Sequence, residues 1–155
     1  MKRTLTFAAI AILSCAAFNG CYKQTQYINS IGATIDSIGF TASGTTQVSF
    51  YADTSTHNPT MVDVSGQTTI YTPGTTTQPS IKLIIPNVAG SYSIPSQAKA
   101  TVVTSATGSG GTAATSGQIV VLSTTSGRLQ GNFTFTCADG TKVTNGQFTG
   151  IVGYP

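Results

Sequence analysis

Charged residues are scarce in this chain. Asp, Glu, Lys and Arg make up 7% of its 155 residues, the four acidic residues are all Asp, and Glu is absent. Beyond residue 20 the basic residues are Lys23, Lys82, Lys99, Arg128 and Lys142. Nucleic acid binding requires a basic stripe that contacts successive phosphates, and five scattered cations do not supply one. We therefore expect no nucleic acid partner.

Residues that perform catalysis are scarce as well. His57 is the only histidine, so a Ser-His-Asp triad would have to use it, and the chain lacks the Gly-x-Ser-x-Gly elbow of many serine hydrolases. Glycoside hydrolysis requires two converging carboxylates, for which the chain offers only Asp. The polar segment from Asp53 to Asn58 lacks a second carboxylate and the ligand spacing of a metal site. We predict a protein that is not an enzyme, with no catalytic residue, metal site or cofactor.

Long hydrophobic runs are absent except near the N-terminus. Lys2 and Arg3 precede an uncharged, largely apolar run over residues 5–18. This run is shorter than the roughly 20 residues that a membrane-spanning helix needs. A short basic start followed by such a run is typical of a secretory signal peptide. We therefore expect the chain to be exported.

The end of this run carries a lipidation signal. Phe18-Asn19-Gly20-Cys21 resembles a lipobox, the motif at which bacterial lipoprotein signals are cut before a cysteine. Cys15, after Ile12-Leu13-Ser14, is a second candidate, but we prefer Cys21 because it follows the apolar run instead of interrupting it. Ordinary cleavage after a small residue such as Ala16 would instead release a soluble protein.

Lipidation of Cys21 predicts both the organisation of the chain and its location. Each acyl methylene buried in a bilayer contributes about 0.8 kcal/mol, so two or three acyl chains hold a protein firmly on a membrane. We expect a protein anchored by lipid to a bacterial membrane, the outer membrane being the expected one. The predicted segments are a signal peptide over residues 1–20, a tether over residues 21–31 and one domain over residues 32–155.

The abundant residue types indicate β structure. The chain has 28 threonines and 17 glycines. Threonine is β-branched and suits a pleated strand, whereas glycine supplies turns. Short apolar or alternating segments recur between the turns, and brief connections force neighbouring strands to be antiparallel. We expect an all-β domain, a single antiparallel meander of about nine or ten strands that forms a β-sandwich or a flattened barrel.

The clearest strand is predicted over residues 128–137. Phe133, Phe135 and Cys137 occupy alternate positions, so they share one face, which we expect to be buried. Asp139-Gly140 and Asn145-Gly146 are signals for tight turns after this strand.

Other expectations concern segments rich in small or polar residues. We expect a turn over residues 37–39 between the first two strands. Asp63 lies between Val62 and Val64, so simple alternation turns it toward solvent. Residues 105–117 contain no aromatic, charged or large apolar side chain, and we expect them to form a dispensable surface loop.

The C-terminal third resembles a known group of proteins. Residues 131–136 (GNFTFT), Gly140 and residues 143–148 (VTNGQF) look like the ending of a family of short lipoproteins of Bacteroidota. Residues 33–36 (ATID) and 39–42 (GFTA) are similar to that family's opening hairpin, whose turn carries Gly where this chain has Ser37-Ile38. The resemblance spans roughly residues 32–151. It implies a lipid anchor and a β-rich fold, and because the family is a domain of unknown function it transfers no catalytic residue.

These observations favour a membrane-anchored envelope lipoprotein whose β domain is non-catalytic and serves in binding or in a structural role. The candidate partners besides the membrane are a glycan, a protein or a small apolar ligand. Tyr51, Tyr71 and Tyr92 would suit sugar stacking if they were exposed. One alternative is a calycin-like carrier with a small apolar ligand inside a barrel. Another is an envelope glycan hydrolase, which the lack of acid–base residues disfavours.

The lipidation site is tested by labelling. Cys21→Ser should abolish incorporation of radiolabelled palmitate and leave an uncleaved or soluble species, because the thiol that receives the lipid is gone. Cys15→Ser is the matched control and should still be labelled. Label that persists in Cys21→Ser and vanishes in Cys15→Ser would assign the lipid to Cys15.

Overall fold

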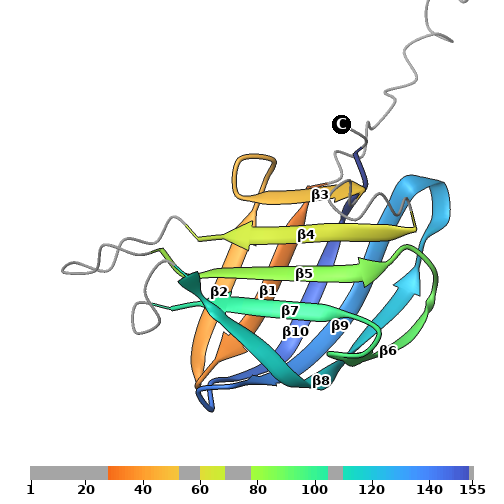
Figure 1. The fold of residues 1–155 in the computed structure, drawn as a ribbon. Helices are drawn as coiled ribbons and strands as arrows, with labels where there is room; N and C mark the ends of the chain where they lie inside the picture. Colours follow the sequence, from red (N-terminus) through yellow and green to blue (C-terminus); the bar gives the residue numbers. More distant parts are fainter. Residues whose placement is uncertain (1–27, 53–59, 69–77, 105–109, 154–155) are drawn as a thin grey trace, which may run out of the picture.

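The computed structural model describes residues 28–52, 60–68, 78–104 and 110–153 of the chain. Strands account for nearly all of the regular structure (Figure 1). In chain order the elements are β1 (Ser30–Ile35), β2 (Ile38–Ser43), β3 (Val48–Ala52), β4 (Met61–Gln67), β5 (Ser80–Pro86), β6 (Gly90–Ile94), β7 (Lys99–Val103), β8 (Thr112–Ser123), the 3-10 turn η2 (Thr125–Gly127), β9 (Arg128–Cys137) and β10 (Lys142–Ile151).

The strands form one antiparallel sheet in the order β2-β1-β10-β9-β8-β7-β5-β4-β3, with β6 paired to β8. The sheet folds over into two layers whose strands cross steeply (Figure 1). Layer A comprises β2, β1, β10, β9, β6 and most of β8, and layer B comprises β7, β5, β4 and β3. Strand β8 belongs to both, because Thr112 and Ala113 pair with β7 and the residues from Ala114 onward pair with β9. The predicted all-β, antiparallel, barrel-like architecture is confirmed.

The residues after β10 join the edge strand β3 to layer A. Beyond β10, the Gly153 N–H donates to the Phe50 carbonyl at 2.8 Å, and the Ala52 N–H donates to the Gly153 carbonyl at 3.1 Å. These bonds form a parallel bridge between Tyr51 of β3 and Gly153. Strand β3 is thereby tied to the layer A side of the molecule, and the barrel is nearly closed.

The core lies between the layers and contains a chain of phenylalanine rings. Phe50 of layer B faces Phe148 at a centroid distance of 6.4 Å, Phe148 stacks on Phe133 at 6.3 Å, and Phe133 stacks on Phe135 at 6.0 Å. Phe133, Phe135 and Cys137 are all buried. The predicted inward face of residues 128–137 is therefore confirmed.

Glycine residues make room for two of the core rings. A Cβ at Gly150 of β10 would overlap the ring of Phe50 in the opposite layer. A Cβ at Gly146 would likewise overlap the ring of Phe133 on the neighbouring strand. The missing side chains therefore provide the space in which the core rings lie.

Of the three turns expected from the sequence, one is confirmed and two are wrong. The Asp139-Gly140 turn is confirmed, since it joins β9 to β10. The first turn lies at Asp36-Ser37, where both residues have positive φ (45° and 75°), instead of at residues 37–39. Positive φ at both central residues is the type I′ geometry that matches strand twist, and Asp tolerates this region of backbone conformation better than most residues do.

Asn145-Gly146 is not a turn. Strand β10 continues through it, with a register shift between Val143 and Gly146 and a φ of 52° at Asn145. The pair forms a β-bulge, in which one extra residue is accommodated within the ladder. A left-handed asparagine serves in a bulge as well as in a turn, so the dipeptide alone does not distinguish the two.

The expected loop over residues 105–117 is wrong in its second half. Strand β8 begins at Thr112, and Ala114 is buried. Gly117 lies against Phe135, so closely that a Cβ would fall 2.6 Å from its Cα. The small residues serve close packing against β9 instead of loop flexibility. Residues 105–109 lie outside the described part of the chain.

The domain also starts earlier than residue 32. Strand β1 begins at Ser30, and Ile31 is buried in the core. The last two residues of the expected tether, Ser30 and Ile31, therefore belong to the sheet.

Phe133→Ala tests how much the packed phenylalanine rings contribute to stability. It should lower the free energy of unfolding by about 3–5 kcal/mol, because a large buried ring is replaced by a cavity. Thr134→Ala, on the outer face of the same strand, should cost about 1 kcal/mol, since it removes one hydrogen bond to the Val143 carbonyl. Denaturant unfolding of both variants provides the comparison, and equal losses would contradict the assignment of the two faces.

Candidate functional site

A row of direct cross-strand partners crosses the outer face of layer A. It runs from Thr41 of β2 through Gly32 of β1, Gln147 of β10 and Asn132 of β9 to Val120 of β8. These positions alternate with the buried residues of each strand, so their side chains face away from the core. Pairing alone therefore brings polar side chains from three strands, those of Thr41, Gln147 and Asn132, into one line.

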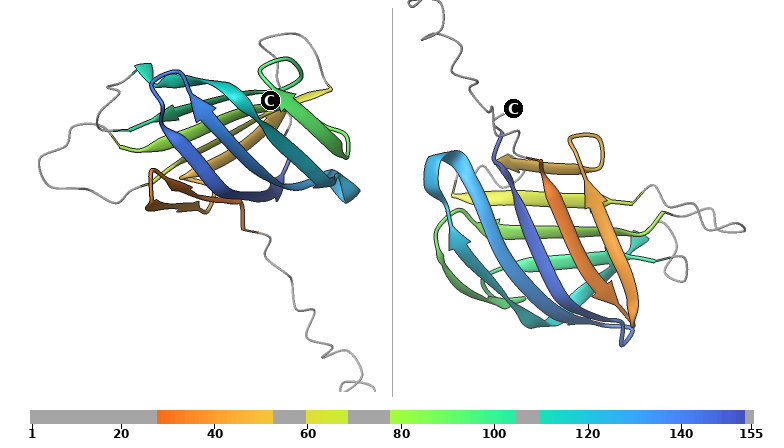
Figure 2. Two further views of the ribbon diagram at one scale, coloured as in Figure 1. Left: turned by 90° about the horizontal axis from the view of Figure 1, so that it is seen from below. Right: turned by 180° about the vertical axis from the view of Figure 1, so that it is seen from behind.

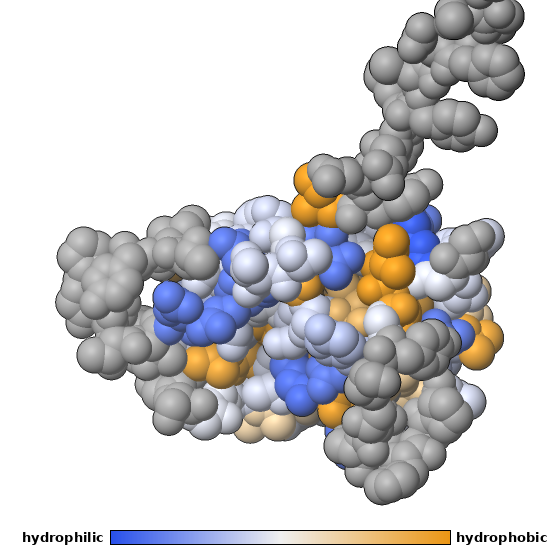
Figure 3. All heavy atoms as spheres, turned by 90° about the horizontal axis from the view of Figure 1, so that it is seen from above, coloured by the Kyte–Doolittle hydropathy of each residue, from blue (hydrophilic) through white to orange (hydrophobic). Residues whose placement is uncertain are grey.

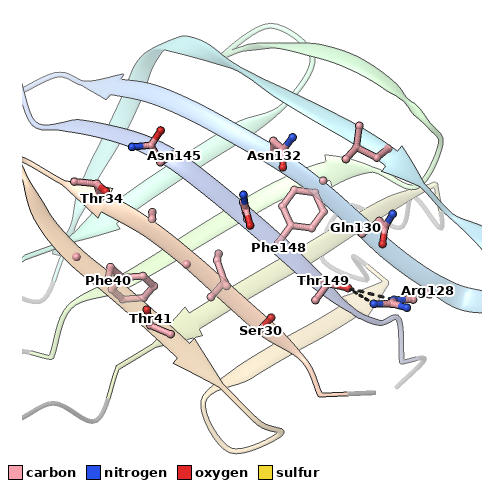
Figure 4. Close-up of a pocket in the computed structure, with 17 residues that line it drawn as sticks. Ser30, Thr34, Phe40, Thr41, Arg128, Gln130, Asn132, Asn145, Phe148 and Thr149 are labelled. Atoms are coloured by element: carbon pink, nitrogen blue, oxygen red, sulfur yellow. Dashed lines mark hydrogen bonds between the residues drawn. The ribbon is translucent and has the colours of Figure 1, made fainter. Parts of the chain in front are cut away.

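The surface along this row is hollowed. A depression of about 650 Å³ extends over β2, β1, β10 and β9 as far as Leu122 of β8, and a second of about 370 Å³ lies over β10, β9 and β8. Asn132, Asn145 and Gln147 line both. We call the two together the outer groove; Figure 4 shows its larger part, and the right panel of Figure 2 shows the layer that carries it.

Four amide side chains dominate the groove: Gln130, Asn132, Asn145 and Gln147. Three occupy regular outward positions of β9 and β10, and Asn145 is presented by the bulge. Within the described part of the chain, none of the four side chains makes a hydrogen bond. Each offers a carbonyl acceptor and two N–H donors, so the groove presents both kinds of group to a ligand.

The floor and the rim of the groove have different chemistry. Phe40 and Phe148, both buried members of the core, lie beneath the amides, and Gly32 and Gly39 leave the floor over β1 and β2 low. Ser30, Thr34 and Thr41 add hydroxyls on the β1–β2 side (Figure 4).

Arg128 is the one charged side chain among the residues that line the described groove. Its Nε and Nη2 both donate to the Thr149 hydroxyl, at 3.2 and 3.1 Å. This pair of bonds fixes the guanidinium at the end of the groove where β9 begins. No acidic residue lines the groove as described, so its field is neutral to slightly positive.

The described carboxylates have structural roles away from the groove. Asp36 accepts the Lys142 N–H at 2.8 Å, and Asp63 is ion-paired with Lys82 at 2.7 Å. Asp63 is half-buried, and one of its oxygens is buried without a hydrogen-bond partner, so it faces solvent less fully than expected. In Asp139 the N–H of Thr141 lowers the carboxyl pKa. A general acid requires a shift in the opposite direction.

Several residues considered in the sequence lie outside the described structure. These are Cys15, Cys21, Asp53, His57 and Tyr71. Of the two remaining tyrosines, Tyr51 is exposed on layer B, and Tyr92 is half-buried with its hydroxyl donating to the Val88 carbonyl at 2.8 Å. Neither lines the outer groove.

No comparison identifies the chain. No protein-family model, curated protein or solved structure matches it. Among the residues that the structure describes, no three His, Cys, Asp or Glu side chains gather as a metal site would require. In the same residues there is no helix with the length and hydrophobicity needed to span a bilayer.

The outer groove was not identified from the sequence, although part of its signal is present there. The alternation that predicts an inward face for Phe133, Phe135 and Cys137 leaves Asn132, Thr134 and Thr136 as the polar face of residues 128–137. The missing information was that β10 and β1 pair beside β9 in a register that places Gln147 and Gly32 next to Asn132. That pairing joins the two ends of the chain, and local patterns do not report it.

Cys137 is a structural thiol. Its Sγ donates to the Thr112 carbonyl at 3.5 Å, and burial, with smaller effects of Asp139 and Asp36, raises the thiol pKa to about 11. A low-pKa, accessible thiolate is what makes a cysteine nucleophilic. Cys137 has the opposite properties and suits packing.

The raised pKa predicts a specific pH dependence. Between about pH 9 and pH 11 the unfolded chain loses the thiol proton and the folded chain keeps it, so the contribution of Cys137 to stability falls as pH rises. The difference in free energy of unfolding between the native chain and Cys137→Ala should therefore shrink over this interval. Denaturant titrations at several pH values measure it. A constant difference would show that the thiol ionises equally in both states.

Proposed function

We propose that this chain is an envelope lipoprotein, anchored through Cys21, whose non-catalytic β domain binds a glycan segment in the outer groove. The observation that carries the proposal is the set of four outward amide side chains that have no hydrogen-bond partner in the described structure and line one hollow of about 650 Å³. This volume lies within the range of about 300–1,000 Å³ that is common for ligand sites.

The chemistry of the groove favours a sugar over an apolar ligand. Neighbouring sugar hydroxyls both donate and accept hydrogen bonds, and each amide does the same. An apolar ligand would cover Gln130, Asn132 and Gln147 without bonding to them, at a cost of about 1–3 kcal/mol for each unsatisfied group. The groove is open along the face of layer A, which suits a segment of a longer chain.

The interior of the barrel is less suited to a ligand. A calycin-like carrier holds its ligand between the sheets, and in this chain the rings of Phe50, Phe148, Phe133 and Phe135 occupy that position. The carrier alternative therefore has no observation that favours it over the groove.

A non-catalytic role is supported by the positions of the described carboxylates. Asp36 and Asp139 support hairpin turns, and Asp63 pairs with Lys82. Hydrolysis of a glycosidic bond would need two carboxyl groups on either side of the bound sugar. The groove as described has none.

The double variant Asn132→Ala, Gln147→Ala tests the groove. Neutral hydrogen bonds contribute about 0.5–1.5 kcal/mol each, so losing those of two central amides should weaken binding about tenfold or more. Envelope oligosaccharides on an array would identify a ligand, and calorimetry with that ligand would measure the loss.

The matched control is Gln67→Ala, an exposed amide on β4 in layer B, which should bind as the native chain does. Both variants should retain native stability because the altered side chains face solvent. Unchanged affinity in the double variant, or native protein that binds no oligosaccharide on the array, would contradict the proposed function.

A further inference from the structure

The two ends of the layer A strands differ in character. At one end lie the start of β1, the end of β10 and the turn η2: the Ile151 N–H donates to Asn29 Oδ1 at 3.0 Å, and the Val152 N–H donates to the Gly127 carbonyl at 2.9 Å. We call this the anchor end, because the described chain begins there. The β1–β2 and β9–β10 turns lie at the opposite end (Figure 1).

The anchor end exposes three aliphatic side chains on layer A. Ile28 is 60% exposed, Ile151 is 46% exposed and Leu122 is 55% exposed. Ile151 of β10 pairs directly with Arg128 of β9. Ser30 pairs with Thr149, and the same antiparallel register extended by two residues would place Ile28 beside Ile151. Leu122 and Arg128 line the same end of the outer groove. Figure 3 looks onto this end and shows separate hydrophobic patches among polar residues.

Among the residues that the structure describes, charge is distributed unevenly between the two ends. Asp36 and Asp139 both lie in the turns of the opposite end, and the third described carboxylate, Asp63, is ion-paired within layer B. Of the described residues named above at the anchor end, only Arg128 is charged, and it is a cation. Aliphatic groups beside a guanidinium match a lipid interface, where acyl chains lie next to phosphates.

The length of chain before β1 limits how far this end can lie from the membrane. Seven residue steps separate Cys21 from Ile28, a span of at most about 25 Å when fully extended. The intervening sequence includes Tyr22, Lys23 and Tyr27, and aromatic and basic residues are the types that membrane interfaces favour. The anchor end is therefore the part of the domain nearest the lipid.

We propose that the anchor end docks on the bilayer surface, with Ile28, Ile151 and Leu122 in the headgroup region and Arg128 against lipid phosphates. This inference rests on the lipidation of Cys21 proposed above. Docking holds layer A upright, so that the outer groove runs from the membrane surface toward its far end.

Tryptophan placed at either end tests this orientation, because the chain contains no Trp. Ile151→Trp carries the probe at the anchor end, and Ile38→Trp, at a residue 74% exposed beside the β1–β2 turn, is the matched control. Each mature lipidated protein is placed in vesicles of phosphatidylcholine and phosphatidylglycerol. In vesicles with brominated acyl chains, the emission of Ile151→Trp should shift to shorter wavelength and lose most of its intensity, and that of Ile38→Trp should not change.

The possible results separate the docking from the anchor. If both variants sediment with vesicles and both probes report water, the protein is anchored but the domain does not dock, and this inference is overturned while the anchor stands. Equal quenching of both probes would also overturn it, since no end would be preferred. Failure of both proteins to sediment would overturn the anchor and the docking together.

Discussion

The packing of four phenylalanine rings between crossed layers constrains the rest of the structure. Phe148 and Phe133 must point inward to meet Phe50, and the glycines at 146 and 150 leave room for them. Because side chains alternate along a strand, this choice sends Asn132 and Gln147 outward. A slip of one residue would bury the amides and expose the rings. The outer groove is thus the reverse side of the core, specified by the same register.

In the proposed function and orientation, glycan binding and membrane attachment use different parts of one face. The amides lie over the middle of layer A, where β10 and β9 are flanked on both sides by paired strands. The exposed aliphatic side chains of Ile28, Ile151 and Leu122 lie at the anchor end. A site on central strands is held by hydrogen-bonded neighbours, which fix the spacing of its side chains more closely than a loop does. Under the proposed orientation, a glycan in the groove would approach the membrane surface at Arg128.

Short sequence patterns predicted the features that depend on neighbouring residues alone. The alternation of Phe133, Phe135 and Cys137 gave the buried face of β9, and Asp139-Gly140 gave its turn. The patterns failed where the same residues serve two structures: Asn145 suits a bulge as well as a turn, and Gly117 packs against Phe135 in a segment whose composition is that of a loop. The outer groove was beyond this reasoning because Gly32 and Gln147 become neighbours only through the pairing of β1 with β10.

That pairing also imposes an order on biogenesis. Strand β1, the first in the chain, lies between β2, which follows it directly, and β10, which is the last strand. A chain threaded through a translocation channel from its N-terminus would deliver β1 early, and its second partner would arrive only when nearly all of the chain had crossed. Contacts between distant segments slow folding, and an unpaired strand edge is exposed to other chains in the meantime. Under the proposed export, the early hairpin therefore depends on a partner that crosses the membrane last.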